Sequence, residues 1–447
     1  MSSRIHIPTS IASPVISRLI TAGLEAADPY RAIVTTVSLR GRSLHVGKRS
    51  YDLSRYNRLL VVGAGKASAR MAQAMESVLR TRLEGGFVVV KTGHSVPTTR
   101  IVVGEAGHPI PNNAGRRAAE HIRTLMQDLS PRDIVFVLLS GGASSLLPAP
   151  VSGITLADKQ RTTRLLLRSG AAIDEINAVR KHLSSLKGGG LVLSTQATIV
   201  SLILSDVIGD DISAIGSGPT APDPTTFADA VAVLQRYKIW RSVPDTVRRH
   251  LLQGRNGAVP ETLKPRSRRL RRVHNTIVGN NRRMLDAVAR AAKSAGLYPV
   301  LLDSAVTGEA RVAAEEFVGV AKPFLRQRRK SRRPLCLISG GEPTVTVTGR
   351  GKGGRAQEFA VAAAFHLDGL SNVWLAAIGS DGTDGPTDVA GAVVSGRTVA
   401  RAGTIGIDLR VALDRHDTYR ALRALGAHIY TGPTGTNVND LYLLLIL

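Results

Sequence analysis

The sequence has few features that would cross-link the chain or anchor it. Its 447 residues include one cysteine, Cys336, which excludes a disulfide framework and suits a reducing compartment. The longest apolar runs, IVFVLL and LYLLLIL, are far shorter than the roughly 20 residues that span a bilayer. The amino terminus lacks a long hydrophobic region followed by a small-residue cleavage site. We therefore expect a soluble, cytoplasmic protein with no membrane partner.

Aromatic residues are also scarce, at 4% of the chain, whereas basic residues are in large excess, with a formal charge of +25. Much of this excess lies in Leu263–His274 and Leu325–Pro334, which could attract phosphate backbones. Neither segment has the interleaved aromatic residues that stack on bases, and no zinc-ligand or helix-turn-helix pattern accompanies them. A solvated basic surface is favoured and no nucleic-acid partner is expected. A nucleic-acid-binding protein with strongly salt-dependent binding stays open as the third-ranked function.

Short apolar runs alternate with helix-like stretches along most of the chain. A first series comprises RLLVVGAG, GGFVVVKTG, DIVFVLLSGG and ATIVSLILSD. A second series begins after a basic, proline-containing stretch near residues 260–272 and comprises HNTIVGNN, YPVLLDS, PLCLISGG, TVTVTG and NVWLAAIGS. Such alternation is typical of parallel sheets covered by helices. We therefore predict an α/β protein with two domains, residues 1–262 and 273–447.

The turn in RLLVVGAGKASARMAQAME fits neither of two familiar phosphate-binding patterns. Ser68 stands where a dinucleotide fingerprint needs a third glycine or alanine. A Walker loop would need a glycine at Leu60 and a serine or threonine at Ala67. Neither template therefore assigns a ligand to this turn.

The physical basis of those patterns is nevertheless present here. Gly63 and Gly65 allow a sharp turn, and the helix that follows presents unpaired amides to an anion. Lys66 at the first turn opposes the helix dipole, and this cost indicates a functional role for the lysine. The alternative is a solvated lysine on an ordinary strand-to-helix turn.

Other polar motifs follow strands later in the chain, where ligands of parallel sheets bind. LLSGGASSLL offers backbone and hydroxyl donors suited to phosphate oxygens, from Ser140, Gly141, Gly142, Ser144 and Ser145. Carboxylates suited to Mg²⁺ follow two further strands, in SLILSDVIGDD and AAIGSDGTDGPTD, at Asp206, Asp381 and Asp384. Each motif alone also fits a structural turn.

Cations complete the set. INAVRKHLSSLKGGGL contains Arg180, Lys181 and Lys187, and GRGKGGRAQEFA contains Arg355. An exposed basic helix is the alternative interpretation of the first three. Together, glycine-rich turns, carboxylates and cations indicate phosphoryl transfer, in which positioning and charge neutralisation carry most of the catalysis.

A set of motifs in this order resembles the class II glycerate kinases, the family with a MOFRL carboxy-terminal domain, from about residue 15 to the end. The motifs are VVGAGKASARMA, EAGHPIPNNAG, LLSGGASSLLPAP, INAVRKHLSSLKGGGL, LSDVIGDDISAIGSGPTAPDPTTF, ISGGEPTVTVTGRGKGGRAQEFA, GSDGTDGPTDVAGAVV and TGPTGTNVNDL. The resemblance is highly specific as a set, although no single motif would be. It implies an ATP- and Mg²⁺-dependent kinase that phosphorylates the 2-hydroxyl of D-glycerate to 2-phospho-D-glycerate.

The resemblance also implies an architecture and residue roles. Family members have an amino-terminal Rossmann-like domain and a smaller α/β MOFRL domain, with the active site in the cleft between them. The family's catalytic lysine and arginine match Lys66 and Arg355. The remaining roles are our own hypothesis and not part of the resemblance. In this hypothesis, the candidates to bind the substrate carboxylate are Arg180, Lys181 and Lys187. Asp206, or less favourably Asp381 or Asp384, would help to bind Mg²⁺, and a homodimer is left open.

Some positions depart from the family pattern, and some questions stay open. Asn112 and Asn113 stand where an acidic residue is usual, Ile208 where proline is usual and Ala356 where asparagine is usual. His108 and Asp206 are alternative general bases. Because family members have often been labelled hydroxypyruvate reductases, NAD(P)H-dependent reduction of hydroxypyruvate is the second-ranked function, although the incomplete dinucleotide fingerprint argues against it.

Overall fold

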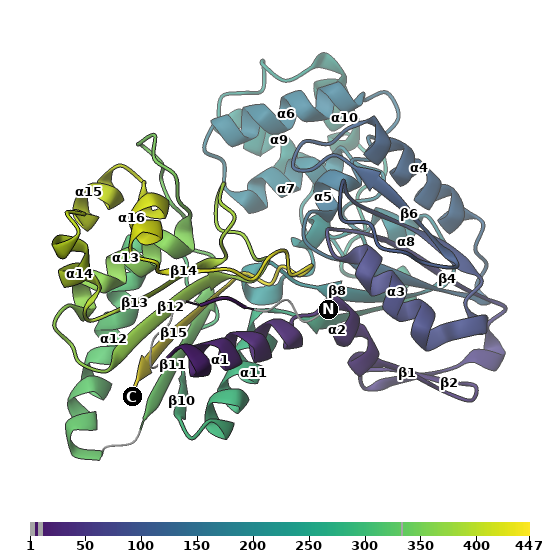
Figure 1. Ribbon diagram of the computed structural model, residues 1–447. Coiled ribbons are helices and arrows are strands. Elements are labelled where there is room, and N and C mark those ends of the chain that lie inside the picture. The colour runs from purple at the N-terminus through teal and green to yellow at the C-terminus, as the bar shows by residue number, and fades with distance from the viewer. Residues whose placement is uncertain (1–4, 8–11, 332–333) are drawn as a thin grey trace. The chain divides into compact units, whose positions relative to one another are not determined.

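The computed structural model describes residues 5–7, 12–331 and 334–447. For residues 325–331 it describes the backbone but not the side chains. The chain divides into two compact units, which confirms the predicted two-domain α/β architecture (Figure 1). One unit is Pro29–Val278 and the other combines Met1–Asp28 with Gly279–Leu447.

The Pro29–Val278 unit is built on a six-stranded sheet in the order β6-β5-β4-β7-β8-β9. These strands are β4 (Arg58–Ala64), β5 (Gly85–Lys91), β6 (Ile101–Ala106), β7 (Asp133–Leu139), β8 (Thr198–Leu204) and β9 (Val273–Gly279). The pairs from β6 to β8 are parallel. Every residue of β7 is buried, as expected for a central parallel strand covered on both faces. The predicted parallel sheet is therefore confirmed.

Helices follow the strands of this unit in the order expected from the sequence. They are α2 (Pro29–Thr36), α3 (Ser68–Leu79), α4 (Asn113–Gln127), α5 (Ala143–Leu146), α6 (Leu156–Arg168), α7 (Ile173–His182), α8 (Gly190–Leu193), α9 (Phe227–Arg236) and α10 (Asp245–Arg255). A small antiparallel sheet follows α2 and consists of β1 (Val37–Arg40), β2 (Ser43–Val46) and β3 (Arg49–Asp52). Helices α6, α7, α9 and α10 gather around an apolar cluster of their own.

The second unit has a mixed six-stranded sheet in the order β10-β11-β15-β12-β13-β14. Its strands are β10 (Tyr298–Leu301), β11 (Leu335–Gly341), β12 (Val373–Gly379), β13 (Gly391–Ser395), β14 (His428–Ile429) and β15 (Asp440–Ile446). Its helices are α1 (Ser13–Ala26), α11 (Asn281–Ser294), α12 (Ala310–Ser331), α13 (Arg355–Leu367), α14 (Thr398–Thr404), α15 (Leu409–Asp414) and α16 (Thr418–Ala424).

Strand β15 occupies the middle of this second sheet. It pairs antiparallel with β11 on one side and with β12 on the other, and all its residues are buried. The Tyr442 ring stacks on Phe359 of α13, with ring centroids 3.9 Å apart and planes 12° apart. The terminal apolar run of the sequence is thus a core strand that positions α13 against the sheet.

The boundaries of the units differ from the predicted domains 1–262 and 273–447. Residues 273–278, placed in the second domain from sequence, belong to the first unit. His274 Nδ1 lies 2.6 Å from the hydroxyl of Tyr51, and Asn275 Oδ1 accepts from the hydroxyl of Thr220 at 2.8 Å. The β9 strand therefore completes the first sheet, and the basic stretch before it is a loop within that unit.

The first 28 residues were also assigned to the wrong unit from sequence. Helix α1 packs on α11, where the Cβ atom of a larger residue at Gly23 would lie 2.9 Å from Val288 Cγ2. The hydroxyl of Thr436 donates to Ala27 O at 2.6 Å. The amphipathic pattern of this helix predicts a buried face, but it does not say which unit that face covers.

The predicted strand TVTVTG, residues 344–349, does not form. Thr344 makes only an isolated parallel bridge with Glu309, and the segment joins neither six-stranded sheet. Val347 is 65% exposed and Thr346 donates to Glu309 instead. Alternating β-branched residues therefore gave a strand pattern without a partner strand.

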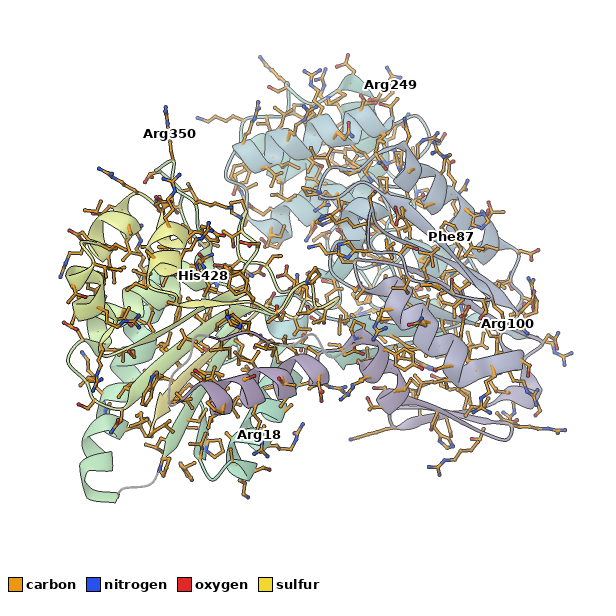
Figure 2. All side chains as sticks on the ribbon, in the orientation of Figure 1. Arg18, Phe87, Arg100, Arg249, Arg350 and His428 are labelled. Atoms are coloured by element: carbon orange, nitrogen blue, oxygen red, sulfur yellow. The ribbon has the colours of Figure 1, made fainter. Side chains whose placement is uncertain are left out.

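The basic residues are spread over many elements. Figure 2 shows four exposed examples, Arg18, Arg100, Arg249 and Arg350. Within Leu263–His274, Arg269 and Arg272 donate to Leu193 O and Val192 O, at 3.4 and 3.1 Å, at the end of α8. Two arginines of this segment therefore have a structural role. The side chains of the second basic segment, Leu325–Pro334, lie outside the description except for Pro334.

None of the helices in the described residues is long and apolar enough to cross a membrane.

Candidate active site

The glycines of the turn after β4 are required by strand packing. A Cβ atom at Gly63 would clash with Leu138 O of β7, and one at Gly65 would clash with Ser140. Gly65 also has a φ of +140°, which side chains rarely allow. The close approach of β4 and β7 therefore accounts for both glycines without a ligand.

The amides of this turn are also bonded within the fold. The Gly65 amide donates to Val89 O at 3.1 Å, and the Lys66 amide donates to Gly141 O at 2.8 Å. The Ala67 amide donates to the Ser140 hydroxyl at 3.0 Å, which gives buried Ser140 a structural role. The anion site predicted at the start of α3 therefore has its first donors occupied.

The turn after β7 is a better candidate for binding an anion. Gly142 is left-handed, with a φ of +86°. The amides of Gly141 and Gly142 make no hydrogen bond with any described residue. The Ser145 hydroxyl donates to Gly142 O at 3.0 Å and so braces the turn from its buried side. Two successive free amides at a left-handed glycine are a common way to bind an oxyanion.

Three functional side chains surround this turn. The space that a Cβ atom at Gly142 would fill lies 3.0 Å from His108 Nε2 and 3.6 Å from Lys66 Cγ. The corresponding space at Gly141 is occupied by an Asp206 carboxylate oxygen. The fold thus brings together Lys66, His108 and Asp206, each of which is partly exposed.

The neighbours of His108 hold it in the neutral form. Burial, and then the positive charges of Lys66, Lys91 and His94, lower the pKa of His108 to about 4. A neutral imidazole can accept a proton or a hydrogen bond at physiological pH. Beside Gly142, His108 therefore provides a hydrogen-bond acceptor next to the Lys66 cation, but its low pKa makes it a weak base.

Two of the three predicted carboxylate-binding cations meet at Ser144. Its hydroxyl oxygen accepts from Arg180 Nη2 at 2.5 Å and from Lys187 Nζ at 2.9 Å. Lys187 Nζ also donates to Ser144 O at 2.7 Å. The Ser144 hydroxyl lies 2.9 Å from that of Ser217. Ser144 is the second residue of α5 and lies two residues after Gly142, so this cluster adjoins the turn.

The third cation, Lys181, is not part of this cluster. Its ammonium group pairs with Asp223 Oδ1 at 3.3 Å, and the two side chains are 6% and 0% exposed. Asp223 also accepts from the hydroxyls of Thr225 and Thr262, at 2.7 and 2.9 Å. Because Lys181 has its own buried carboxylate, the predicted role in substrate binding is not supported by its position.

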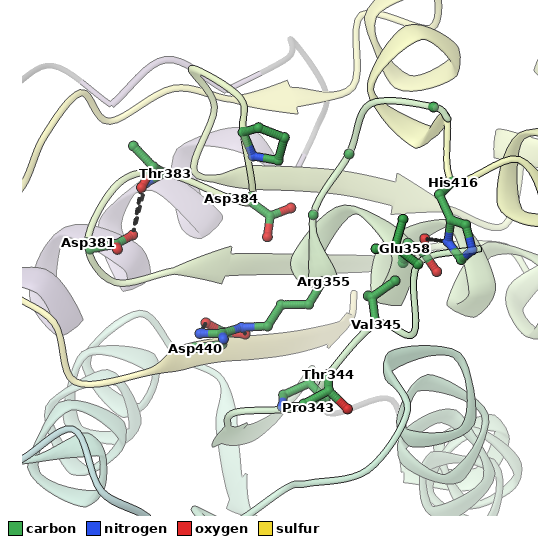
Figure 3. A pocket seen from close by; sticks show the side chains of 16 residues that line it. Pro343, Thr344, Val345, Arg355, Glu358, Asp381, Thr383, Asp384, His416 and Asp440 are labelled. Atoms are coloured by element: carbon green, nitrogen blue, oxygen red, sulfur yellow. Dashed lines mark hydrogen bonds and ion pairs between the residues drawn. The ribbon is translucent and has the colours of Figure 1, made fainter. Parts of the chain in front are cut away.

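The second unit has a pocket of about 550 Å³ around the start of α13. Figure 3 shows Arg355, Asp384 and Asp440 within it, with Glu358 and His416 at one side. The glycine-rich segment before α13 forms part of its wall. The pocket therefore gathers the predicted catalytic arginine and both predicted metal ligands of this unit, Asp381 and Asp384.

Arg355 is fixed by two carboxylates. Its Nε and Nη2 donate to the two oxygens of Asp440 at 2.7 and 3.0 Å, and Nη1 donates to Glu342 at 2.9 Å. Burial opposes the charge of Arg355, but the bonds to Asp440 and the charges of Asp440 and Glu342 raise its pKa above the usual range. Of the five guanidinium donors, two stay available to a ligand.

Asp440 is itself held by Tyr442, whose hydroxyl donates to it at 2.9 Å. Burial raises the pKa of Asp440 to about 6, against the opposing effect of Arg355. Sequence reasoning missed this residue because Asp440 begins an otherwise apolar strand. The motif TGPTGTNVNDL includes Asp440, but nothing in that motif indicates which arginine the carboxylate contacts.

Asp384 caps α13. Its carboxylate accepts from the amides of Ala356 and Gln357 at 3.0 and 2.9 Å, and from Gln357 Nε2 at 2.9 Å. It is 3% exposed, and burial raises its pKa. Its oxygens are thus used by the helix that carries Arg355. Asp381 is more accessible, although one of its oxygens accepts from Thr383.

A buried charged cluster at the pocket edge was not predicted. Glu358 accepts from Arg311 Nε at 2.9 Å and lies 2.6 Å from His416 Nδ1. Both Glu358 and His416 are largely buried. A helical Glu, a distant Arg and a loop His carry no common sequence pattern, so only the fold reveals the cluster.

Two departures from the family pattern have structural explanations. Asn112 caps α4 by accepting from the Gly115 amide at 3.0 Å. Ala356 is fully buried in the apolar core of its unit. Within the described residues, no group of three or more His, Cys, Asp or Glu side chains could hold a metal ion.

Comparison with known proteins gives matches along nearly the whole chain. Residues 15–252 match a domain described as a domain of unknown function (DUF4147), and residues 335–440 match the MOFRL family. The chain is 40% identical to the glycerate 2-kinase of Pyrococcus horikoshii, over 96% of each chain. It is 41% identical, over 97% of this chain and 94% of the other, to an Agrobacterium vitis protein with a provisional hydroxypyruvate reductase name. The crystal structure of glycerate kinase from Thermotoga maritima superposes with a TM-score of 0.84 at 39% identity, over 96% of this chain and 98% of that chain.

Proposed function

This chain belongs to the family built from a DUF4147 domain and a MOFRL domain, and we propose that it is a glycerate 2-kinase. The reaction transfers the γ-phosphate of ATP to the 2-hydroxyl of D-glycerate and gives 2-phospho-D-glycerate and ADP. The observation that carries the proposal is the 40% identity to a glycerate 2-kinase over 96% of each chain. ATP and D-glycerate are thus the proposed small-molecule partners.

In the Pro29–Val278 unit, the turn after β7 would bind oxygens of the transferring phosphoryl group. The free amides of Gly141 and Gly142 would donate to these oxygens, and Lys66 beside them would neutralise developing charge. Of the glycines predicted from sequence to bind phosphate, this assignment keeps Gly141 and Gly142 and leaves out Gly63 and Gly65. Both of those glycines are explained by strand packing.

In the second unit, Arg355 would contribute charge from a fixed position. Asp440 and Glu342 hold its guanidinium group, so little reorganisation would accompany the transfer. The two remaining N–H donors of Arg355 would bind phosphoryl oxygens. A dissociative transfer requires mainly such positioning and charge neutralisation.

Mg²⁺ binding is compatible with this proposal because the cation needs few protein ligands. It usually keeps several waters and binds one or two carboxylates plus substrate phosphates. Asp206, partly exposed beside Gly141, is the best candidate ligand. Asp384 fits poorly because amides occupy its oxygens, and Asp381 is the alternative in its unit. The cation would neutralise nucleotide phosphate charge.

A paired assay of the purified protein tests the proposed reaction. ADP formation from MgATP and D-glycerate would be followed with the product identified by ³¹P NMR. In parallel, NADH and NADPH oxidation would be followed with hydroxypyruvate, because relatives carry a provisional reductase name. We expect phosphate on the 2-oxygen and no nicotinamide oxidation. Reductase turnover without phosphoryl transfer would overturn the proposal.

A variant cycle tests the proposed roles of Lys66 and Arg355. Lys66→Ala and Arg355→Ala should each lower kcat by roughly 10²-fold or more, as loss of one preorganised donor typically does. If both act on one phosphoryl group, the double variant should lose much less than the product of the two single losses. Strictly multiplicative losses would indicate that the two residues act independently.

A further inference from the structure

Two lysines and an arginine gather in the Pro29–Val278 unit without a neutralising carboxylate. Lys159 on α6 and Lys187 are 7% and 3% exposed, and Arg180 on α7 is partly buried. No Asp or Glu among the described residues pairs with them. The charged groups that shift the pKa values of the two lysines are other members of this cluster. Buried cations are rarely left without a counter-charge.

Other buried cations of the protein differ in this respect. Lys181 lies next to Arg180 in the sequence, yet it pairs with buried Asp223. Arg355 pairs with Asp440 and Glu342. Unlike Lys181 and Arg355, the Lys159, Arg180 and Lys187 cluster has no carboxylate counter-charge among the described residues, and a bound anion would supply one.

Burial and mutual repulsion lower the pKa values of both lysines in this cluster. Burial, together with the positive charge of Arg180, lowers the pKa of Lys159 well below its usual range. Burial, followed by the charges of Arg180 and Lys159, has the same effect on Lys187. A ligand carboxylate would relieve both the desolvation and the mutual repulsion. The free protein thus keeps an unfavourable charge arrangement that anion binding would correct.

The geometry indicates where the anion would lie. Arg180 Nη2 and Lys187 Nζ converge on the Ser144 hydroxyl, at 2.5 and 2.9 Å. Ser144 follows the turn whose free amides and neighbouring Lys66 we assign to the phosphoryl group. A carboxylate held at Ser144 would leave the adjacent carbon and its hydroxyl close to that turn, as a 2-hydroxy acid requires.

Lys159 has a different position from the other two cations. Its ammonium group donates to Pro148 O and not to Ser144, so it stands outside the set of donors that converge on Ser144. Its charge still acts on Lys187 and is acted on by Arg180. Lys159 would therefore strengthen the positive potential at the two ligand-binding cations.

We propose that Ser144, Arg180 and Lys187 bind the carboxylate of a small 2-hydroxy acid, with Lys159 as a positioning residue behind them, and that this site binds the acid without nucleotide. The identity of the acid rests on the proposed glycerate 2-kinase function. In this site Ser144 binds the 2-hydroxy acid, whereas the sequence analysis assigned it to phosphate. The site also includes Lys159, which the sequence did not indicate.

Calorimetric titration of the full chain without nucleotide tests the site. D-glycerate should bind, whereas glycerol, which has the same carbon chain without the carboxylate, should not bind measurably. Arg180→Met and Lys187→Met should each weaken D-glycerate binding at least about tenfold, because each removes a charged hydrogen bond. Arg164→Met is the matched control, since Arg164 is exposed on α6. It should bind D-glycerate like the wild type.

Kinetics separate the proposed role of Lys159 from a merely structural one. Lys159→Met should raise the KM for D-glycerate several-fold, with kcat and the KM for ATP unchanged, and Lys159→Arg should restore part of the affinity. Equal changes in all three parameters would overturn the positioning role. If Lys159→Met does not fold, Lys159→Arg and the two ligand-binding variants still decide the question.

The possible failures are distinguishable. Unchanged D-glycerate affinity in Arg180→Met and Lys187→Met would overturn the site while leaving glycerate kinase activity intact. Binding only in the presence of nucleotide would overturn its independence. Binding that depends on these residues, without phosphoryl transfer to D-glycerate, would support the site and overturn the proposed function.

Discussion

Arg355 and Asp440 form a two-pronged ion pair, with Nε and Nη2 of the arginine at 2.7 and 3.0 Å from the two carboxylate oxygens. The arginine starts α13 and the aspartate starts β15, so the pair joins a helix to the central strand of its sheet. Such a pair fixes a guanidinium plane more firmly than a single contact would. The predictions that follow begin with this pair.

Arg355→Lys should behave almost like Arg355→Ala. A lysine keeps the charge but presents one ammonium group and cannot match both oxygens of Asp440 while also contacting Glu342. We expect kcat for ADP formation to fall roughly 10²-fold, measured at saturating MgATP and D-glycerate. Arg350→Lys, on an exposed residue, should leave kcat unchanged. Wild-type turnover in Arg355→Lys would show that charge alone suffices.

Asp440 should make stability depend on pH in the weakly acidic range. Its folded pKa of about 6 lies above the usual value of 3.8, so the folded state binds the proton more tightly. The stability contribution of Asp440 is therefore fully present below about pH 4 and is lost as pH rises through 6. Asp384, whose pKa burial also raises, acts in the same direction.

The measurement is the difference in unfolding free energy between the wild type and Asp440→Asn from pH 4 to pH 7. The difference should move in favour of Asp440→Asn as pH rises. A pH-independent difference would mean that Asp440 is ionised throughout.

The pH dependence of kcat should also report on Asp440. Protonation of Asp440 should loosen Arg355, so kcat of the wild type should fall below about pH 6. Asp440→Asn should not show this decrease at acidic pH.

Lys181→Met should destabilise the protein without affecting acceptor binding. It leaves buried Asp223 without its ammonium partner, and loss of one member of a buried pair typically costs about 3–5 kcal/mol. Denaturant unfolding measures this loss, and Lys181→Met combined with Asp223→Asn should recover part of it. A raised KM for D-glycerate in properly folded Lys181→Met would restore the predicted binding role of Lys181.

Asp206 and Asp384 should respond differently to substitution. Asp206→Asn should raise the Mg²⁺ concentration that gives half-maximal rate, because a neutral amide is a poorer ligand for this cation. Asp384→Ala should instead lower the unfolding free energy by about 1–2 kcal/mol, since it removes the cap of α13. A changed Mg²⁺ requirement in Asp384→Asn, with stability preserved, would contradict the capping role.

The fold was largely predictable because the strands of the first sheet carry long apolar runs. Strand β7 is buried at every residue, and a short continuous apolar run such as DIVFVLL is typical of a parallel strand buried on both faces. The unit boundaries were less predictable. An amphipathic helix such as α1 shows that one face is buried, but its partner, α11, lies more than 200 residues later in the chain.

The candidate site was predictable in its residue types and less so in their partners. Lys66 and Arg355 stood out through the motifs around them. Adjacent residues on a helix point about 100° apart, so Arg180 and Lys181 face different surroundings, and the sequence does not say which one faces the ligand. Lys159 gave no signal because it lies on a helix rich in polar residues. Its burial follows only from tertiary packing.

The place of β15 has a consequence for how the protein is made. This strand comes last among the strands in the sequence, yet it sits between β11 and β12 and carries Asp440. A ribosome that has synthesised β11 and β12 has therefore made two strands whose shared neighbour does not yet exist. The Pro29–Val278 unit can fold while synthesis continues, but the sheet around Arg355 has to wait for the final residues of this sequence. A messenger truncated a few codons before β15 would lose the whole arginine site together with that strand.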